Sequence, residues 1–324
     1  MTQYNPYEAE VSDAGSESPN RLFEEDNFSP RRIIRPKTDY YNHCNNASQR
    51  TDTVYALTVC ANLLKWKNNE DVLDVGTGDG GVTSDILLPR LPEDLKKLVC
   101  LDVSEKMVEF TRDRLKHNSK AEFVQMDIAT KEIPSELFER FDHIFSFNCL
   151  HWVPGDKHLQ ALKNLHKMLK PGGQLLVTII STAAMFDIYE NMARDKKRSP
   201  FLKNVQDYLH FCVITSQKIR QKNWKKIAYT LTRVFRVFGV GWAKAINPFV
   251  RNLQNNLQES YFQDYFKELR KHDKVMFEVE NDKEKVHLFY SFLVACASKS
   301  SVEDSKSGLF SGVGRDALLV DSSD

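Results

Sequence analysis

The stretch Val72-Leu73-Asp74-Val75-Gly76-Thr77-Gly78-Asp79-Gly80 decides the fold of this chain of 324 residues. An apolar run that ends in an acid and continues into alternate glycines predicts a strand that turns tightly beneath a ligand. Glycine suits such a turn because it adopts backbone conformations closed to other residues, and because no Cβ keeps a ligand from the backbone. We expect Asp74 to fix the turn and Asp79 to cap the helix that follows. Several classes of cofactor-binding protein share this pattern, so the next strands must distinguish them.

Acidic residues also end the next two predicted strands. The apolar segment 98–104 contains Asp102 at its strand end, where a carboxylate accepts both hydroxyls of a ribose. That position is common to dehydrogenases. The third segment, 122–128, contains Asp127, and dehydrogenases seldom have an acid there. Two more strands are predicted over 141–147 and 174–180, so the core consists of strands and helices in alternation.

In this order the segments resemble the class I S-adenosylmethionine methyltransferases. The resemblance implies an α/β, Rossmann-like fold with a mostly parallel sheet, an antiparallel last strand over 287–296, and a helical lid insertion. It implies S-adenosylmethionine as the cofactor, with Asp127 on the adenine amino group and Asp74 near the amino-acid end. The residues then expected to bind the cofactor are Asp74, Gly76, Thr77, Gly78, Asp102, Val103, Asp127, Ile128 and Phe147.

Three further segments are similar to the juvenile hormone acid O-methyltransferases of arthropods, which esterify farnesoic or juvenile hormone acid. They are Leu150-His151-Trp152 after the fourth strand, 46–52 in the predicted first helix, and 245–249. This resemblance covers about residues 39 to 298. It implies that the amide of Gln49 and the indole N–H of Trp152 hold the carboxylate of an apolar small-molecule acid. Such an acid is already ionised at neutral pH, so the enzyme must aim it rather than deprotonate it.

Other interpretations stay open at these positions. Trp152 could be a core residue between sheet and helix, and Gln49 an exposed residue of a first helical turn. His151 is a third catalytic candidate: it would be the general base if the substrate were an alcohol or a phenol, and otherwise it packs or positions the cofactor. The alternative functions are therefore a methyltransferase for another small molecule with His151 as base, or a catalytically silent paralogue that binds cofactor or lipid. No metal is expected.

The stretch 194–251 departs most from the family. It holds fourteen Lys or Arg residues against two acids, with aromatic residues between them. We favour a lid whose aromatic residues line an apolar pocket. The competing interpretation places 222–244 on an anionic membrane surface. No Gly-Phe turn precedes Trp224, so the strand that usually follows such a turn is expected to be lost or replaced.

Composition bears on nucleic-acid binding, on the state of the cysteines and on the location of the protein. A net charge of +1 gives no case for nucleic-acid binding. The six scattered cysteines predict reduced thiols. With no signal-like N-terminus and no long apolar run, we expect a cytoplasmic protein with no obligate protein partner. The expected divisions are a disordered extension (1–37), the cofactor-binding core (38–182), the helical lid (183–270), the C-terminal strands of the core (271–298) and a disordered tail (299–324).

Overall fold

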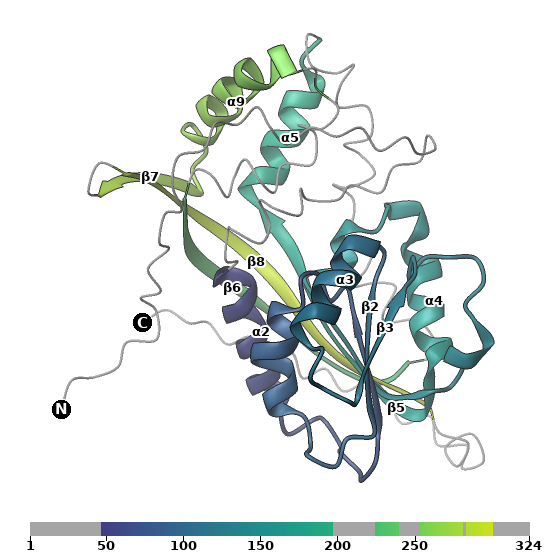
Figure 1. Ribbon diagram of the computed structural model, residues 1–324. Coiled ribbons are helices and arrows are strands. Elements are labelled where there is room, and N and C mark those ends of the chain that lie inside the picture. Colours follow the sequence, from purple (N-terminus) through teal and green to yellow (C-terminus); the bar gives the residue numbers. More distant parts are fainter. Residues whose placement is uncertain (1–46, 197–223, 240–252, 254, 281–282, 301–324) are drawn as a thin grey trace, which may run out of the picture.

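A computed structural model describes residues 47–196, 224–239, 253, 255–280 and 283–300. The predicted disorder at both ends, the segment 245–249 and much of the stretch 194–251 lie outside these residues. The rest forms one twisted sheet with helices packed on it (Figure 1). Among the described residues, no helix is long and apolar enough to cross a membrane.

Eight strands make the sheet. They are β1 (Asp71–Val75), β2 (Lys97–Asp102), β3 (Ala121–Gln125), β4 (Phe141–Phe147), β5 (Leu169–Ala183), β6 (Trp224–Gly239), β7 (Val275–Glu280) and β8 (Lys283–Lys299). The order is β3-β2-β1-β4-β5-β8-β6, and β7 pairs with β8 off this path. Strands β1 to β5 are parallel, whereas β8 is antiparallel to β5. The predicted sheet, mostly parallel with an antiparallel last strand, is confirmed.

Five longer helices accompany the sheet in the described part of the chain: α2 (Ala47–Val59), α3 (Glu105–Arg114), α4 (His158–Met168), α5 (Ala184–Arg194) and α9 (Asn255–Leu269). Apolar strand residues alternate between two cores, as the pleat of a strand requires. Val72 and Phe145 pack in the same core as α2, while Leu73 and Ile144 pack with α4. The sheet is therefore covered on both faces, which explains why its parallel strands are almost wholly apolar.

Helices α5 and α9 stand beyond the carboxyl end of β5 (Figure 1). They contact each other through stacked rings of Tyr189 and Tyr265, whose centroids lie 5.7 Å apart. Both tyrosines are buried, and burial raises the pKa of each well above its usual range. This pair of helices occupies part of the region predicted to be the lid.

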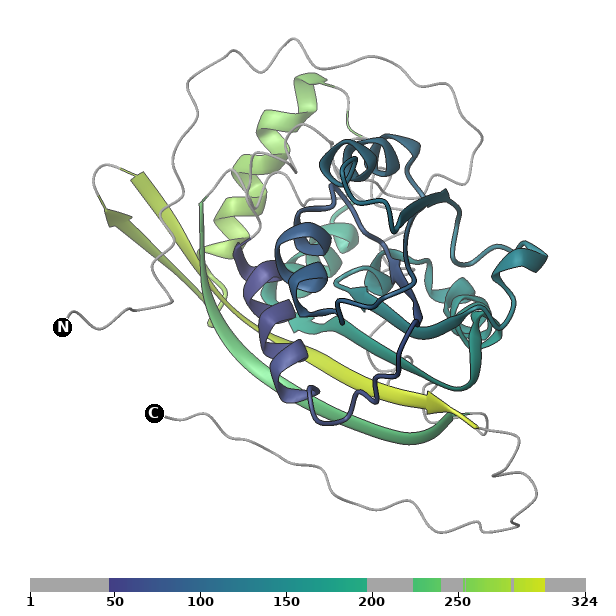
Figure 2. The same ribbon diagram turned by 60° about the horizontal axis from the view of Figure 1, so that its bottom comes forward.

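The prediction of a helical segment over 183–270 is wrong in its middle. Residues 224–239 form β6, which pairs antiparallel with β8 and lies at the edge of the sheet, as the curved strand beside β8 in Figure 2 shows. The sixth strand is therefore present although no Gly-Phe turn precedes it, and the expectation that this strand is lost or replaced is wrong. The mixture of basic and aromatic residues in this segment favours a helix when the sequence is considered alone. In the structure its backbone groups pair with β8 instead.

Apolar residues at helical spacing over 48–66 predict a helix before the first strand, and the observed α2 is shorter. It ends at Val59 and tightens into a turn, where Leu63 N donates to the Cys60 carbonyl at 2.9 Å. The side chain of Gln174 then binds the backbone of the segment after this turn. Its amide nitrogen donates to Leu63 O at 2.8 Å, and its oxygen accepts from Lys65 N at 2.6 Å. A side chain from β5 thus holds the segment that connects α2 to β1.

Candidate active site

The glycine turn lies where β1 meets β2. Gly76, Gly78 and Gly80 all have positive φ, at 78°, 59° and 77°. Such values suit glycine because it has no Cβ. Gly76 N donates to the Leu101 carbonyl of β2 at 2.7 Å. The turn is therefore held against the end of the neighbouring strand, as the motif predicts.

Asp102 ties the two strand ends together. Its Oδ2 accepts from Gly78 N at 3.0 Å, and its Oδ1 accepts from Ser104 N at 2.9 Å. The carboxylate thus reaches the glycine turn, where the sequence predicts it.

Asp74 supports the turn from below. Its buried carboxylate accepts a hydrogen bond from the Thr83 hydroxyl at 2.6 Å. Burial raises the pKa of Asp74 to about 6, the hydrogen bond from Thr83 opposes this rise, and the nearby charge of Asp102 adds to it. The Thr77 hydroxyl lies 3.1 Å from that of Thr83 and 3.2 Å from that of Thr111, so a buried chain of hydroxyls braces the turn.

The loop after β4 packs directly on the glycine turn. A Cβ at Gly76 would lie 2.2 Å from Cys149 Sγ. Burial raises the pKa of the Cys149 thiol to about 12, so the thiol is neutral. Strand order reverses between β1 and β4, and open α/β sheets bind their ligands at such a switch point. Asn148 has a φ of 49°, and its buried side-chain oxygen has no hydrogen-bond partner among the described residues.

Trp152 and His151 follow in a short helical turn, Leu150–Trp152. Trp152 N donates to the Cys149 carbonyl at 2.8 Å, so the half-buried indole follows within one turn of the residue that touches Gly76. The His151 ring is buried, with its centroid 5.2 Å from that of Trp152. Burial, together with the neighbouring His158, lowers the pKa of His151 to about 3. His151 is therefore neutral at physiological pH.

Gln49 lies half-buried in the first turn of α2. The next residue, Arg50, donates from Nη1 to the Gly81 carbonyl at 3.3 Å and from Nη2 to Asp85 Oδ2 at 2.9 Å. This turn of α2 therefore lies beside the segment that leaves the glycine turn. The structure thus brings Gln49 to the same end of the sheet as Trp152.

The remaining predicted residues surround this edge of the sheet. Asp127 follows β3, where its Oδ1 accepts from Ala129 N at 2.8 Å and its Oδ2 lies 3.7 Å from Lys157 Nζ. Val103 is half-buried at the end of β2. Ile128 and Phe147 are almost fully buried and belong to the two cores. For these two, packing is the observed role.

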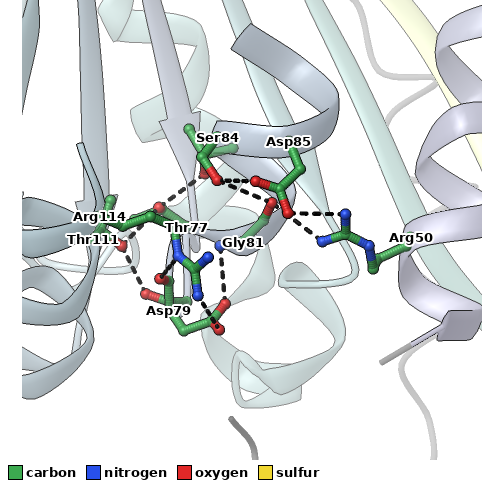
Figure 3. A network of polar contacts seen from close by, with 10 residues as sticks. Arg50, Thr77, Asp79, Gly81, Ser84, Asp85, Thr111 and Arg114 are labelled. Carbon is green, nitrogen blue, oxygen red and sulfur yellow. Dashed lines mark hydrogen bonds and ion pairs between the residues drawn. The ribbon is translucent and has the colours of Figure 1, made fainter. Parts of the chain in front are cut away.

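A polar network around the turn was missed from the sequence (Figure 3). Asp79 accepts from Gly81 N at 3.0 Å, within the turn itself, and it also pairs with Arg114 of α3 at 3.3 Å. Arg50 approaches from α2 and reaches Asp85. Both arginines come from helices distant in sequence, so no local motif signals these contacts. A weak signal existed for Arg50, which directly follows the predicted Gln49.

Comparison with known proteins assigns the chain. Residues 73–175 match a family model described as a methyltransferase domain. The chain is 31% identical to juvenile hormone acid O-methyltransferase of Drosophila melanogaster, over 69% of this chain and 80% of that protein. The chain belongs to the juvenile hormone acid O-methyltransferase family. The Bombyx mori protein of the same name is 29% identical over 69% of this chain and 83% of its own length.

A solved structure agrees on the fold of this family member. The YcgJ protein of Bacillus subtilis superposes with a TM-score of 0.52 at 14% identity, covering 76% of this chain and 99% of that one. The enzyme is a methyltransferase that uses S-adenosylmethionine, as predicted. The site fits this cofactor: the Asp102 carboxylate lies at the glycine turn, and the buried side-chain oxygen of Asn148, which has no hydrogen-bond partner among the described residues, can accept from a ligand.

Proposed function

We propose that this enzyme transfers a methyl group from S-adenosylmethionine to the carboxylate of an apolar small-molecule acid of the juvenile hormone acid class. The observation that carries the proposal is the position of Trp152, one helical turn beyond Cys149, which packs on Gly76. From this position the indole N–H would serve as a neutral donor to the substrate carboxylate beside the cofactor turn. The names of the relatives in Drosophila melanogaster and Bombyx mori support the same substrate class.

The proposed mechanism needs orientation but no base. S-adenosylmethionine supplies the electrophilic methyl group when it is bound. The glycine turn and Asp102 would hold the amino-acid end and the ribose, and Asp127 the adenine amino group. Gln49 and Trp152 would donate hydrogen bonds to the ionised carboxylate and so fix the attacking oxygen. Proximity of this kind supplies up to about 7–11 kcal/mol in well-ordered cases.

Neutral donors suit this task. A lysine or arginine would form a charge-assisted pair with the carboxylate and stabilise the ground state, which lowers its nucleophilic reactivity. The alternative with His151 as base is disfavoured because a ring whose pKa is lowered to about 3 is a weak proton acceptor near neutral pH.

The decisive experiment measures transfer of a labelled methyl group into organic-extractable product. The purified chain is offered juvenile hormone acid, farnesoic acid, and a panel of fatty and aromatic acids. Trp152→Phe keeps a ring but loses the donor, so we expect kcat to fall about a hundredfold, as for other lost transition-state donors. Trp66→Phe is the matched control, because the Trp66 ring packs on His143 toward the opposite end of the sheet, with centroids 4.0 Å apart and planes tilted by 33°.

Each outcome has a distinct meaning. Ester formation from an isoprenoid acid, lost in Trp152→Phe and kept in Trp66→Phe, supports the proposal. Full activity in Trp152→Phe would refute the assigned substrate contact. Cofactor binding without transfer to any acid would instead favour the silent paralogue. Asp102→Asn, measured by cofactor titration, should weaken binding of S-adenosylmethionine itself.

A further inference from the structure

Arg50 joins the helix that carries Gln49 to the segment that leaves the glycine turn. Its two terminal nitrogens donate to different acceptors there, the Gly81 carbonyl and Asp85 Oδ2 (Figure 3). Asp85 is itself held by the Ser84 hydroxyl. Because Gly81 immediately follows the last glycine of the turn, a single hydrogen bond connects Arg50 to the end of that turn.

The same part of α2 is fixed on its other side. Tyr290 of β8 donates its hydroxyl to Asp52 Oδ2 at 2.5 Å, and both groups are buried. Asp52 and Arg50 lie two residues apart and contact different parts of the protein. Gln49 directly precedes Arg50, so its position depends on the contact that Arg50 makes with the cofactor segment. The contact at Asp52 is buried, whereas Arg50 contacts the segment that follows the glycine turn.

We propose that Arg50 is a positioning residue that couples the two binding sites. Occupation of the glycine turn by the cofactor orders the first turn of α2 through Gly81 and Asp85, and so presents Gln49 to the acid. This inference rests on the proposed role of Gln49. Coupling between two binding sites is reciprocal, so the cofactor favours binding of the acid by the same factor as the acid favours binding of the cofactor.

The location of Arg50 separates this role from a purely structural one. The side chains of Arg50 and Asp85 are 33% and 46% exposed. Exposed ion pairs contribute at most about 1 kcal/mol, because water and salt screen them. In a protein of this size such a loss lowers Tm by less than about 4 °C. A large effect on ligand-dependent behaviour in an Arg50 variant would therefore not come from unfolding.

The test measures amide hydrogen exchange in residues 47–52 of the full-length chain, with and without saturating S-adenosylhomocysteine. Saturation is checked for each variant by titration. In the wild type we expect the ligand to slow exchange at least about fivefold, the low end of typical couplings. Arg50→Ala should lose this protection. Arg50→Lys keeps the charge but has a single ammonium group in place of the fork, so it should keep part of the protection.

Arg114→Ala is the matched control. Arg114 also contacts the glycine turn, through Asp79, but it reaches the turn from α3. We expect this variant to keep the wild-type protection of α2. Equal protection in wild type and Arg50→Ala, or none in the wild type, would overturn the inference. So would loss of ligand binding in Arg50→Ala, because Arg50 would then be part of the cofactor site itself.

The outcome is separable from the proposed function because the exchange measurement contains no acid. Arg50-dependent protection in a chain that esterifies no acid would refute the proposed substrate and leave intact the ordering of α2 by the cofactor through Arg50. Esterification without Arg50-dependent protection would refute the coupling alone.

Discussion

At the scale of single residues, the buried charge of Asp74 lowers the free energy of unfolding of the ligand-free protein. Burial raises its pKa to about 6, against an ordinary value of 3.8. Below pH 3.8 the carboxyl is neutral in both folded and unfolded chains, and the cost is absent. As pH rises through 6 the native state must ionise a buried group, and the cost becomes complete. The raised pKa therefore lowers stability at neutral pH, as expected where a site is built to meet a charged ligand.

Asp74→Asn removes this charge and keeps an acceptor for Thr83. We expect the free variant to be more stable than the wild type at pH 8, by at most about 3 kcal/mol, since each pKa unit corresponds to 1.36 kcal/mol. The gain should shrink to nothing near pH 4. Urea unfolding at the two pH values measures it, and cofactor titration should show weaker binding in the variant. An equal stability difference at both pH values would contradict this account.

His151 gives a second prediction at this scale. With a pKa lowered to about 3, its ring stays neutral from pH 6 to pH 9. A carboxylate substrate is ionised over the same range. The profile of kcat against pH should therefore show no step near 6.5 that His151→Gln removes. Finding such a step would revive His151 as a general base and favour an alcohol or phenol substrate.

At the scale of elements, one buried hydrogen bond fixes α2 to the sheet. Tyr290→Phe removes the donor to Asp52 and leaves a buried carboxylate with one partner fewer. We expect the free energy of unfolding to fall by about 1–3 kcal/mol. Thr58→Ala is the control on the same helix. The exposed Thr58 hydroxyl donates to the Val54 carbonyl one turn earlier, so its removal leaves no buried charge without a donor. Chemical denaturation of both variants tests the difference, and equal losses would refute the buried anchor.

Elements also show where prediction from sequence succeeds. β4 has the predicted bounds, 141–147, because an apolar run buried on both faces of a parallel sheet leaves a continuous signal. β6 was missed because it lies at the edge of the sheet and is rich in Lys and Arg, as edge strands often are. Its pairing with β8 is specified by backbone groups distant in the chain, and no local pattern reveals that.

At the scale of the whole molecule, the predicted site residues have a local sequence signal, whereas the missed residues depend on contacts between segments distant in the chain. Asp74, Asp102 and Asp127 could be located because each lies at or just after the carboxyl end of its own strand, and parallel strands bring those ends to one edge. Arg50 and Cys149 could not, since their contacts with the glycine turn exist only after α2 and the β4 loop have packed there. Local motifs thus predict the acidic residues at the strand ends. The groups that pack against the glycine turn, Arg50 and Cys149, are brought there by tertiary packing.

The contact between Gly76 and Cys149 joins the glycine turn after β1 to the loop after β4, and substitutions at both residues measure how tightly the two segments pack. Gly76→Ala would place a Cβ 2.2 Å from Cys149 Sγ and 2.4 Å from its Cβ, on a residue with φ of 78°. Overpacking of this kind typically costs about 1–3 kcal/mol, and the left-handed backbone adds about 1–2 kcal/mol. Cys149→Gly removes both contacting atoms but not the backbone strain. In a double-mutant cycle followed by urea unfolding, the pair should therefore be more stable than the sum of the single changes predicts. Strict additivity would mean that the β4 loop moves aside freely, and that the two halves of the sheet meet only loosely at the cofactor turn.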